Sequence, residues 1–249
     1  MPVTFKLTVV IPVYNHEKPL VKVVAALVGK NIPCVLVNDG SNAQCTQVMR
    51  KLAEQPLIHL TELAHNQGKG GAVMAGLREA LRLGYSHALQ VDADGQHDVN
   101  DVQRFMTIAE QHQTSVICGY PRYDESVPKG RLYARYITHV WVWINTLSLS
   151  IKDSMCGFRV YPLASTVALL DKVQLGKRMD FDIEILVRLS WDNQPMLWLQ
   201  TKVHYPEDGV SHFKAGLDNL LISKMHARLF FGMLWRSPRL LRRKISHGF

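Results

Sequence analysis

The stretch Leu89-Gln-Val-Asp92-Ala-Asp94-Gly-Gln-His97 joins the end of a buried strand to two carboxylates in a turn that contains glycine. Alternate residues of an extended segment point to the same side, so Asp92 and Asp94 can face one point. Carboxylate oxygens so placed suit Mg²⁺ or Mn²⁺, which in turn hold phosphate oxygens. The alternative is a strand followed by an acidic surface turn, because Asp-x-Asp is a short motif.

Strand and helix patterns alternate around this stretch. Apolar runs predict buried strands at 7–11, 34–37, 57–60, 86–91 and 115–118. Helical periodicity predicts helices at 19–30, 43–52, 66–83 and 99–111. This alternation, with continuously apolar strands, indicates an α/β, Rossmann-like three-layer fold with a mostly parallel central sheet.

Three polar loops follow predicted strands and should meet at one edge of the sheet: 12–17, 38–41 and 92–96. Ligands of such sheets bind at the carboxyl ends of the strands. The first loop could frame a nucleobase, the second bind base or ribose, and the third hold metal and diphosphate. Lys69 and the glycines of 66–71 add a helix N-terminus that suits an anion, although a loop rich in glycine would look the same.

The charge is placed unevenly along the 249 residues, whose formal net charge is +8. From Asn219 to the end there are seven Lys or Arg and no Asp or Glu; without these seven, the 29 basic residues fall to 22 against 21 acidic ones. The basic character therefore belongs to the C-terminal segment. It favours a localised anionic partner and argues against a nucleic-acid surface.

Other features of the sequence indicate the cellular compartment. Four scattered cysteines without a CxxC pair argue against a zinc site or a disulfide framework and fit a reducing, cytoplasmic compartment. The first residues show no signal-peptide pattern, and no run of about 20 uncharged apolar residues predicts a membrane-spanning helix.

Five motifs occur in order along the chain: Val-Ile-Pro-Val-Tyr-Asn at 10–15, Val-Asn-Asp-Gly-Ser at 37–41, Asn-Gln-Gly-Lys-Gly at 66–70, Asp-Ala-Asp-Gly-Gln at 92–96 and Cys-Gly-Phe-Arg at 156–159. Together they resemble the family 2 glycosyltransferases of the GT-A fold, and most closely the polyprenyl-phosphate (dolichyl-phosphate) mannosyl- and glucosyltransferases. The resemblance covers about residues 6 to 190.

The resemblance implies a nucleotide-sugar donor and inversion at the anomeric carbon. It places Asp92, Asp94 and Gln96 on a divalent ion, Mg²⁺ or Mn²⁺, that bridges the diphosphate, which also makes Asp94 a catalytic candidate. It places Lys69 near the ribose or diphosphate. The residues implied around the nucleoside are Pro12, Tyr14, Glu17 and Asp39. In the first loop, His16 stands where relatives commonly have the glutamate, which follows here as Glu17.

Three arginines are candidates for binding phosphate. Breaking a sugar–diphosphate bond leaves negative charge on the nucleotide, which a divalent ion and basic groups stabilise. Arg122, Arg131 and Arg159 could each clamp the diphosphate or an acceptor phosphate with a planar guanidinium. Arg159, within the Cys-Gly-Phe-Arg motif, is the catalytic candidate, Arg122 is assigned to the donor and Arg131 to the acceptor. Arg122 and Arg131 could each instead be a solvated surface charge.

Carboxylates in the second half of the chain are acceptor-side candidates. If the acceptor is an alcohol, an inverting transfer needs a general base, and Asp182 or Glu184 is the catalytic candidate. If the acceptor is a lipid phosphate, it is already an anionic nucleophile and no strong base is required. Asp153 and His212 are further candidates near the acceptor. The acids at 180–184 could also complement the dipole of the helix that they precede.

Two helices of the second half carry Trp, Tyr and Arg together. The segment 130–151 predicts a helix whose basic stripe and aromatic residues are typical of a membrane–water boundary, or of a core helix with surface arginines. The segment 217–235 predicts a further amphipathic helix. The basic tail 236–244 suits anionic lipid headgroups, the alternative being a flexible tail in solution. We expect a GT-A domain at 1–213, with a nucleotide-sugar half (1–118) and an acceptor half (119–213), followed by a helix and basic tail at 214–249.

The leading hypothesis is a metal-dependent inverting glycosyltransferase with a lipid-linked or membrane-delivered acceptor, peripherally bound to the cytoplasmic face of a membrane. The same donor chemistry could serve a soluble or polymer acceptor. A sugar nucleotidyltransferase would call for a Gly-rich basic loop after the first strand, where this chain has Pro-Val-Tyr-Asn. A non-catalytic module that binds sugar nucleotides is the remaining alternative.

Overall fold

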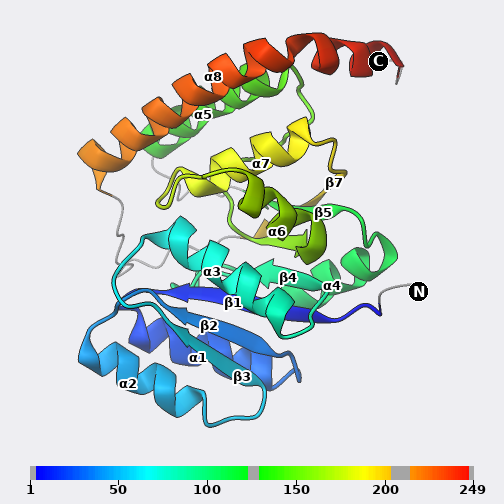
Figure 1. Ribbon diagram of the computed structural model, residues 1–249. Helices are drawn as coiled ribbons and strands as arrows, with labels where there is room; N and C mark the ends of the chain where they lie inside the picture. Colours follow the sequence, from blue (N-terminus) through cyan, green and yellow to red (C-terminus); the bar gives the residue numbers. More distant parts are fainter. Residues whose placement is uncertain (1–3, 123–128, 203–213, 247–249) are drawn as a thin grey trace.

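The computed structural model describes residues 4–122, 129–202 and 214–246 (Figure 1). Residues 122, 129–134, 215 and 244–246 are described through their backbone alone. Within these ranges, seven strands form one sheet in the order β3-β2-β1-β4-β6-β5-β7. The strands are β1 (Leu7–Val13), β2 (Cys34–Asn38), β3 (Ile58–Glu62), β4 (His87–Gln90), β5 (Val116–Arg122), β6 (Arg159–Pro162) and β7 (Met196–Lys202).

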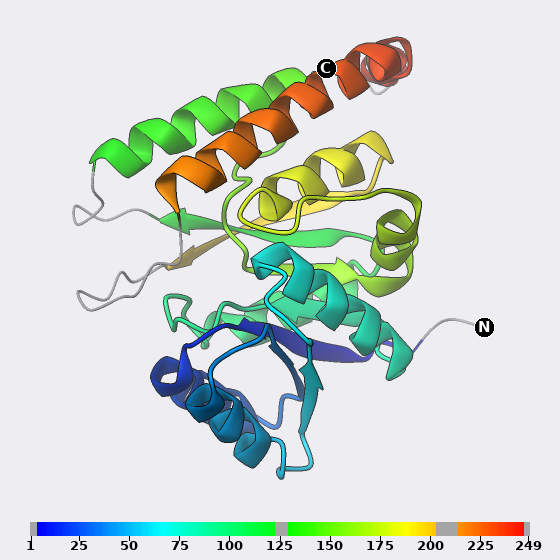
Figure 2. The same cartoon turned by 60° about the vertical axis from the view of Figure 1, so that its left-hand side comes forward.

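Helices cover both faces of the sheet. They are α1 (Glu17–Val28), α2 (Ala43–Leu52), α3 (Lys69–Arg82), α4 (Asp101–Gln111), α5 (Lys129–Thr146), α6 (Leu163–Lys172), α7 (Phe181–Trp191) and α8 (Ala215–Ser246). Residues on one side of the strands, such as Val10 and Val37, pack with α3, α6 and α7, whereas Val9 and Leu36 on the other side pack with α1, α2 and α4. The alternation of side chains along a strand thus gives two cores on the two faces. Helices α5 and α8 lie outside α7 as a further layer (Figures 1 and 2).

The prediction of an α/β fold with a mostly parallel sheet is confirmed. Strand β1 pairs with β2 and β4, β2 with β3, and β5 with β7, all in parallel. The exception is β6, which runs antiparallel between β4 and β5. The sequence did not predict β6 or α6. Two of the four residues of β6, Arg159 and Tyr161, are polar although fully buried, so the segment lacks the apolar run that identifies the other strands.

The ends of two helices differ most from the predictions. Helix α5 ends at Thr146 instead of Ile151, and Leu147 takes a positive φ of 50°. Helix α8 continues through Pro238 to Ser246, so the predicted tail 236–244 is helical. Buried Leu240 extends the apolar seam of the helix, and Arg243 donates to the carbonyls of Ser190 and Trp191 at the end of α7 (3.2 and 2.5 Å). These contacts fix the end of α8 against the domain.

The predicted halves 1–118 and 119–213 share one sheet, because β4 from the first pairs with β6 from the second. Among the residues that the structure describes, no helix is long and apolar enough to cross a membrane.

His226 joins α8 to α5 inside the protein. The ring is 6% exposed, and Asn145 Nδ2 donates to its Nδ1 at 3.2 Å. Burial lowers the pKa of His226 from 6.5 to about 4. The contact between the two helices therefore requires the neutral imidazole.

We expect this histidine to make the protein less stable in acid. As the pH falls from 6.5 to about 4, the unfolded chain takes up the proton before the folded one does, so stability is full above pH 6.5 and is lost on the way to pH 4. The slope from one such group is at most about 1.4 kcal/mol per pH unit. Urea unfolding measured across this range should show that the free energy of unfolding falls less steeply with decreasing pH in His226→Leu than in the natural chain. The exposed His112 provides the control: His112→Leu should leave the slope unchanged, and equal slopes for all three proteins would contradict the prediction.

Candidate active site at the carboxyl ends of the strands

The loops after β1 and β2 are bound to each other. The Asn15 backbone N–H donates to Ser41 Oγ (3.2 Å), and the Asn42 N–H donates to Asn15 Oδ1 (2.8 Å). The Asp39 N–H donates to the Val13 carbonyl (2.9 Å). Because β1 lies between β2 and β4 in the sheet, these loops adjoin the turn that carries Asp92. The structure thus places the three predicted polar loops together at one edge.

Asp39 holds the loop that leads into α3. Its two carboxylate oxygens accept the backbone N–H groups of Gln67 (2.6 Å) and Gly68 (2.9 Å). Burial raises the pKa of Asp39, although these hydrogen bonds oppose the rise. Gly68 has a φ of +88°, and a Cβ there would lie 2.5 Å from the Lys177 carbonyl oxygen, so only glycine fits between the two loops.

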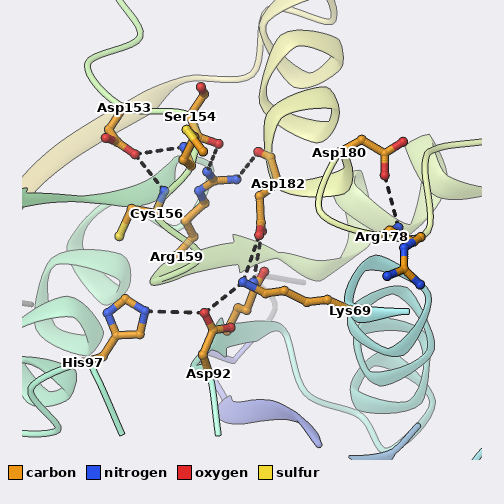
Figure 3. Close-up of polar contacts among 12 residues, drawn as sticks. Lys69, Asp92, His97, Asp153, Ser154, Cys156, Arg159, Arg178, Asp180 and Asp182 are labelled. Atoms are coloured by element: carbon orange, nitrogen blue, oxygen red, sulfur yellow. Dashed lines mark hydrogen bonds and ion pairs between the residues drawn. The ribbon is translucent and has the colours of Figure 1, made fainter. Parts of the chain in front are cut away.

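Lys69, the first residue of α3, is the centre of the site (Figure 3). Its Nζ lies 2.8 Å from Asp92 Oδ2 and 3.0 Å from Asp182 Oδ2. Burial acts to lower the pKa of Lys69, but the charges of Asp182 and Asp92 outweigh it and raise that pKa above its ordinary value. One ammonium group therefore joins the end of β4 to the start of α7.

Asp182 is held from several sides. Its Oδ1 accepts from Gln90 Nε2 (3.1 Å), and its backbone carbonyl accepts from Arg159 Nη1 (2.6 Å). Tyr161 links the two donors, since its hydroxyl donates to Gln90 Oε1 and accepts from Arg159, both at 3.4 Å. All four side chains are buried, so the carboxylate of Asp182 has a fixed position relative to Lys69.

Gly157, in the Cys-Gly-Phe-Arg motif, lets the backbone approach this cluster. A Cβ at Gly157 would lie 2.7 Å from Gln90 Nε2, 3.0 Å from Lys69 Nζ and 3.4 Å from Asp92 Oδ1. A larger residue would push into the polar cluster. Local geometry therefore explains two residues of the motif: Gly157 lets the backbone pass close to Lys69, and Arg159 holds Asp182 in place.

Asp92 and Asp94 differ in their environments. Burial acts to raise the pKa of Asp92, but the charge of Lys69, with a smaller contribution from the nearby His97, holds it below its ordinary value. For Asp94, burial and then the neighbouring charge of Asp92 raise the pKa, although its Oδ1 accepts the Gln96 N–H at 3.0 Å. Each carboxylate is thus within electrostatic reach of the other.

The residues of this turn fit a divalent ion that a ligand helps to hold. Asp92 Oδ1 is buried and makes no hydrogen bond within the described residues. Asp94 and Gln96 supply further oxygen atoms in the same turn. In the part of the chain that is described, no three His, Cys, Asp or Glu side chains are grouped as a metal site. Mg²⁺ typically takes one or two carboxylates and completes its shell with water and substrate phosphates.

Two predicted catalytic residues have other positions. Glu184 is fully buried, and its carboxylate accepts from the Gly176 N–H (2.9 Å), Arg188 Nε (2.7 Å) and Arg228 Nη2 (2.6 Å). It joins α7 to α8 and does not contact Lys69. Arg159 is also fully buried, and its guanidinium donates to the backbone carbonyls of Asp182 (2.6 Å) and Ser154 (2.8 Å), so in this geometry it helps to position Asp182.

Asp153 connects the loop before β6 to α5. Its Oδ1 accepts the backbone N–H groups of Met155 (2.9 Å) and Cys156 (2.7 Å), and its Oδ2 accepts from Arg135 Nε (2.8 Å). The geometry gives Asp153 a part in fixing the Cys-Gly-Phe-Arg motif.

The remaining candidates lie at the same edge or outside the description. Pro12 pairs with Val37 in the sheet, Tyr14 follows β1 directly, and Glu17 begins α1; all three are partly buried. Arg122 ends β5 and Arg131 lies in α5, and their side chains are outside the described part of the structure, as is the whole of His212.

Sequence analysis assigned no role to four residues that complete the cluster, although it quoted the segments that hold the first three: Gln90, His97, Gly157 and Tyr161. Gln90 and Tyr161 had a signal, because a polar residue in a short apolar strand must find a buried partner. His97 Nε2 lies 3.8 Å from Asp92 Oδ2, and its ring packs against Phe158. The sequence shows these residues but not that β6 returns beside β4.

An open α/β sheet with polar loops and an acidic turn at the carboxyl ends of its strands has the architecture of the GT-A glycosyltransferases. Solved structures support the fold. The glucosyl-3-phosphoglycerate synthase of Mycobacterium tuberculosis, solved with phosphoglyceric acid, superposes with a TM-score of 0.64 at 14% identity, covering 94% of this chain and 80% of that one. S. aureus TarS in complex with UDP-GlcNAc gives 0.59 at 16% identity, covering 97% and 73%.

The sequence places the chain within that class. The family model "Glycosyl transferase family 2" matches residues 8–170, so the chain belongs to this family and is a glycosyltransferase, as predicted. A dolichyl-phosphate beta-glucosyltransferase of Dictyostelium discoideum is 28% identical over 212 residues, which are 76% of this chain and 64% of that protein. A UDP-N-acetylglucosamine–dolichyl-phosphate N-acetylglucosaminyltransferase of Methanococcus voltae is 25% identical, over 72% of this chain and 77% of its own length.

We expect Lys69→Met to lower the free energy of unfolding by about 3 kcal/mol at neutral pH, because it leaves the partly buried Asp92 and the buried Asp182 without their shared cation. The loss should shrink as the pH falls, since the uncompensated carboxylates then take up protons. Denaturant unfolding at several pH values measures it. Lys177→Met on the exposed neighbouring loop is the control, with an expected change within about 0.5 kcal/mol. An equal loss in both variants would mean that Lys69 is not the centre of the cluster.

Proposed function

We propose that this chain is a metal-dependent, inverting glycosyltransferase that moves a sugar from a nucleotide-sugar donor to a lipid-linked or membrane-delivered acceptor of the polyprenyl-phosphate or glycolipid type. The observation that carries the proposal is the Lys69 ammonium, which joins Asp92 in the donor half of the chain to Asp182 in the acceptor half. The two ends of a transfer reaction would meet at this point.

In this proposal the donor nucleotide lies along the bound loops after β1 and β2. Pro12, Tyr14, Glu17 and Asp39 would surround the nucleoside, with Lys69 and Arg122 near the diphosphate. The backbone N–H groups that Asp39 accepts show that its carboxylate also shapes this loop. We keep 1–118 as the donor half, 119–213 as the acceptor half and 214–249 as the C-terminal helix.

Mg²⁺ or Mn²⁺ would be held by Asp92, Asp94 and Gln96. The buried Asp92 Oδ1, which makes no hydrogen bond in the described part, supports this assignment. A divalent ion there supplies charge stabilisation for the departing nucleoside diphosphate. Lys69 keeps Asp92 ionised over a wide pH range, because it holds the pKa of that carboxyl down.

The geometry around Asp182 bears on the acceptor. Its two oxygens already accept from Lys69 and Gln90, so the hydroxyl of an acceptor alcohol would have to compete with these two donors for the carboxylate. This arrangement favours an acceptor that is itself anionic, such as a lipid phosphate, over an alcohol. If the acceptor is an alcohol, Asp182 is the candidate base, and Glu184 is not, because it is paired with Arg188 and Arg228.

The acceptor side and the membrane complete the proposal. Arg131, Asp153 and His212 remain candidates near the acceptor, with Asp153 acting through the loop that it fixes. Relatives whose names include a dolichyl-phosphate acceptor support a lipid phosphate here. The basic end of α8, residues 236–244, would bring the protein to the anionic cytoplasmic face of a membrane. A soluble or polymer acceptor is the competing possibility.

Asp94→Asn tests the metal assignment with little disturbance to the turn, because asparagine keeps the oxygen that accepts the Gln96 N–H. We expect sugar transfer to fall by about 10²-fold or more, since charge stabilisation of the leaving group is lost. The rise in melting temperature caused by a nucleoside diphosphate should require Mn²⁺ or Mg²⁺ in the natural chain and disappear in the variant. Asp98→Asn, in the same loop, is the matched control and should behave as the natural chain does. Metal-dependent turnover that persists in Asp94→Asn refutes the site.

Asp182→Asn tests the acceptor class. With an anionic acceptor, we expect the dependence of kcat on pH to keep its shape, because no base is removed. With an alcohol acceptor, kcat should fall by about 10² to 10⁴-fold and lose the limb that reports deprotonation of the base. The anomeric configuration of the product, read by NMR, should be opposite to that of the donor; retention would contradict the inverting mechanism.

A further inference from the structure

The outward face of α5 is apolar. Tyr136 and Ile137 are 68% and 63% exposed, although the residues opposite them on the helix, Thr138 and Val142, are buried. A surface helix ordinarily turns its polar side outward. The exposed apolar residues follow helical spacing and form one stripe: Tyr136, Ile137, Val140, Trp141 and Ile144.

Helix α8 has the same inverted pattern. Its inner side buries Met225, Leu229 and Met233, whereas Trp235 is 88% exposed and Phe231 69% exposed. The exposed apolar residues again lie on the side away from the core: Leu217, Leu220, Phe231, Leu234, Trp235 and Leu241.

These two stripes belong to one surface. The rings of Trp141 on α5 and Phe230 on α8 meet edge to face at 6.2 Å, and the helices run side by side in both views (Figures 1 and 2). Elsewhere in the described part of the chain, exposed large apolar residues are few and scattered: Val21, Leu81, Leu83 and Leu149. A concentrated apolar surface of this kind marks a site of association. We call the outward side of α5 and α8 the outer face.

The outer face is also basic. By sequence, α5 and α8 hold ten Lys or Arg and one acid, Asp218, which is fully buried and accepts from Arg178 Nε at 2.9 Å. Three of the arginines bond inward, Arg135 to Asp153, Arg228 to Glu184 and Arg243 to carbonyls of α7. Lys224, Arg239 and Arg242 of α8 are exposed. Near the end of α8, a hollow of about 490 Å³ is lined by Trp235, Pro238, Arg239, Arg242 and Arg243. Aromatic and apolar side chains among cations match the boundary between anionic headgroups and lipid tails.

We propose that the outer face is a docking surface for an anionic lipid bilayer, on which α5 and α8 lie flat with their apolar stripes inserted. The inference rests on the proposed function, which gives such docking its purpose. It goes beyond binding through the basic end of α8 in two ways: α5 also contacts the bilayer, and insertion of apolar side chains adds to the attraction between charges. A second copy of the chain is a poorer occupant. A symmetric contact would bring the basic groups of both outer faces together without acids to neutralise them.

Docking would bring the site to the membrane. Helices α5 and α8 begin at the edge of the molecule at which β5 and β7 end (Figure 2). The first turn of α8 is tied by Asp218 to Arg178, and the neighbouring Lys177 carbonyl accepts the Gly71 N–H of α3 at 2.9 Å. A bilayer beneath the outer face would therefore be separated by α8 from the loop that touches the start of α3, next to Lys69.

Vesicle co-sedimentation, without donor or acceptor, tests the inference. Vesicles of phosphatidylcholine mixed with phosphatidylglycerol should bind the natural chain, and phosphatidylcholine vesicles should bind it at least about tenfold more weakly. Tyr136→Ser/Ile137→Ser on α5 and Arg239→Glu/Arg242→Glu on α8 should each weaken binding to the anionic vesicles by about tenfold or more. The matched controls on distant surfaces, Val21→Ser/Leu83→Ser and Lys22→Glu/Lys30→Glu, should bind as the natural chain does.

The outcomes separate this inference from the proposed function. If the α8 pair weakens binding but the α5 pair does not, the basic end of α8 acts alone and the outer face is refuted, while the proposed membrane association stands. If the natural chain binds no vesicle, or binds both kinds equally, the electrostatic docking is refuted as well. If the α5 pair instead abolishes a dimer seen by analytical ultracentrifugation, the outer face is an interface between copies of the chain. Nucleotide-induced thermal shifts should be unchanged in all four variants, which shows that the site is intact.

Discussion

The bridge from the Lys69 ammonium to Asp92 and Asp182 is the interaction on which the site depends. Three segments far apart in the sequence meet there: the end of β4, the first residue of α3 and the first turn of α7. A partly buried cation between two carboxylates is stable only when its partners are fixed, because removing either leaves an uncompensated charge. The surrounding hydrogen bonds from Gln90 and Arg159 provide that fixation.

The same constraint explains the residues around the bridge. Gly157 is small so that the backbone can pass close to Lys69, and Gly68 allows the loop held by Asp39 to enter α3 with a positive φ. Arg159 donates to the backbone carbonyls of Asp182 and Ser154 inside the protein. Motifs that look like a set of ligand contacts are thus partly the framework that positions a smaller number of reactive groups.

The outer layer extends this framework to the surface. Glu184 accepts from Arg228 of α8, and Asp218 of α8 accepts from Arg178, so two ion pairs connect the layer to the loop and helix that carry the site. Both carboxylates are fully buried. The helices that carry the outer face are therefore bonded to α7, which holds Asp182, and to the loop before it.

The sequence by itself determined the α/β class, the parallel core of the sheet, the polar loops at its carboxyl edge and membership of the family. These follow from local patterns, since apolar runs, helical periodicity and short motifs need no distant partner to be recognised. Only the tertiary structure decided that β6 inserts antiparallel beside β4, that Asp182 and not Glu184 meets Lys69, and that Arg159 faces inward. It also decided that α8 continues through Pro238. Each of these depends on which segments pack together. Neither an ion pair nor a polar strand shows a periodicity in the sequence from which its partner could be predicted.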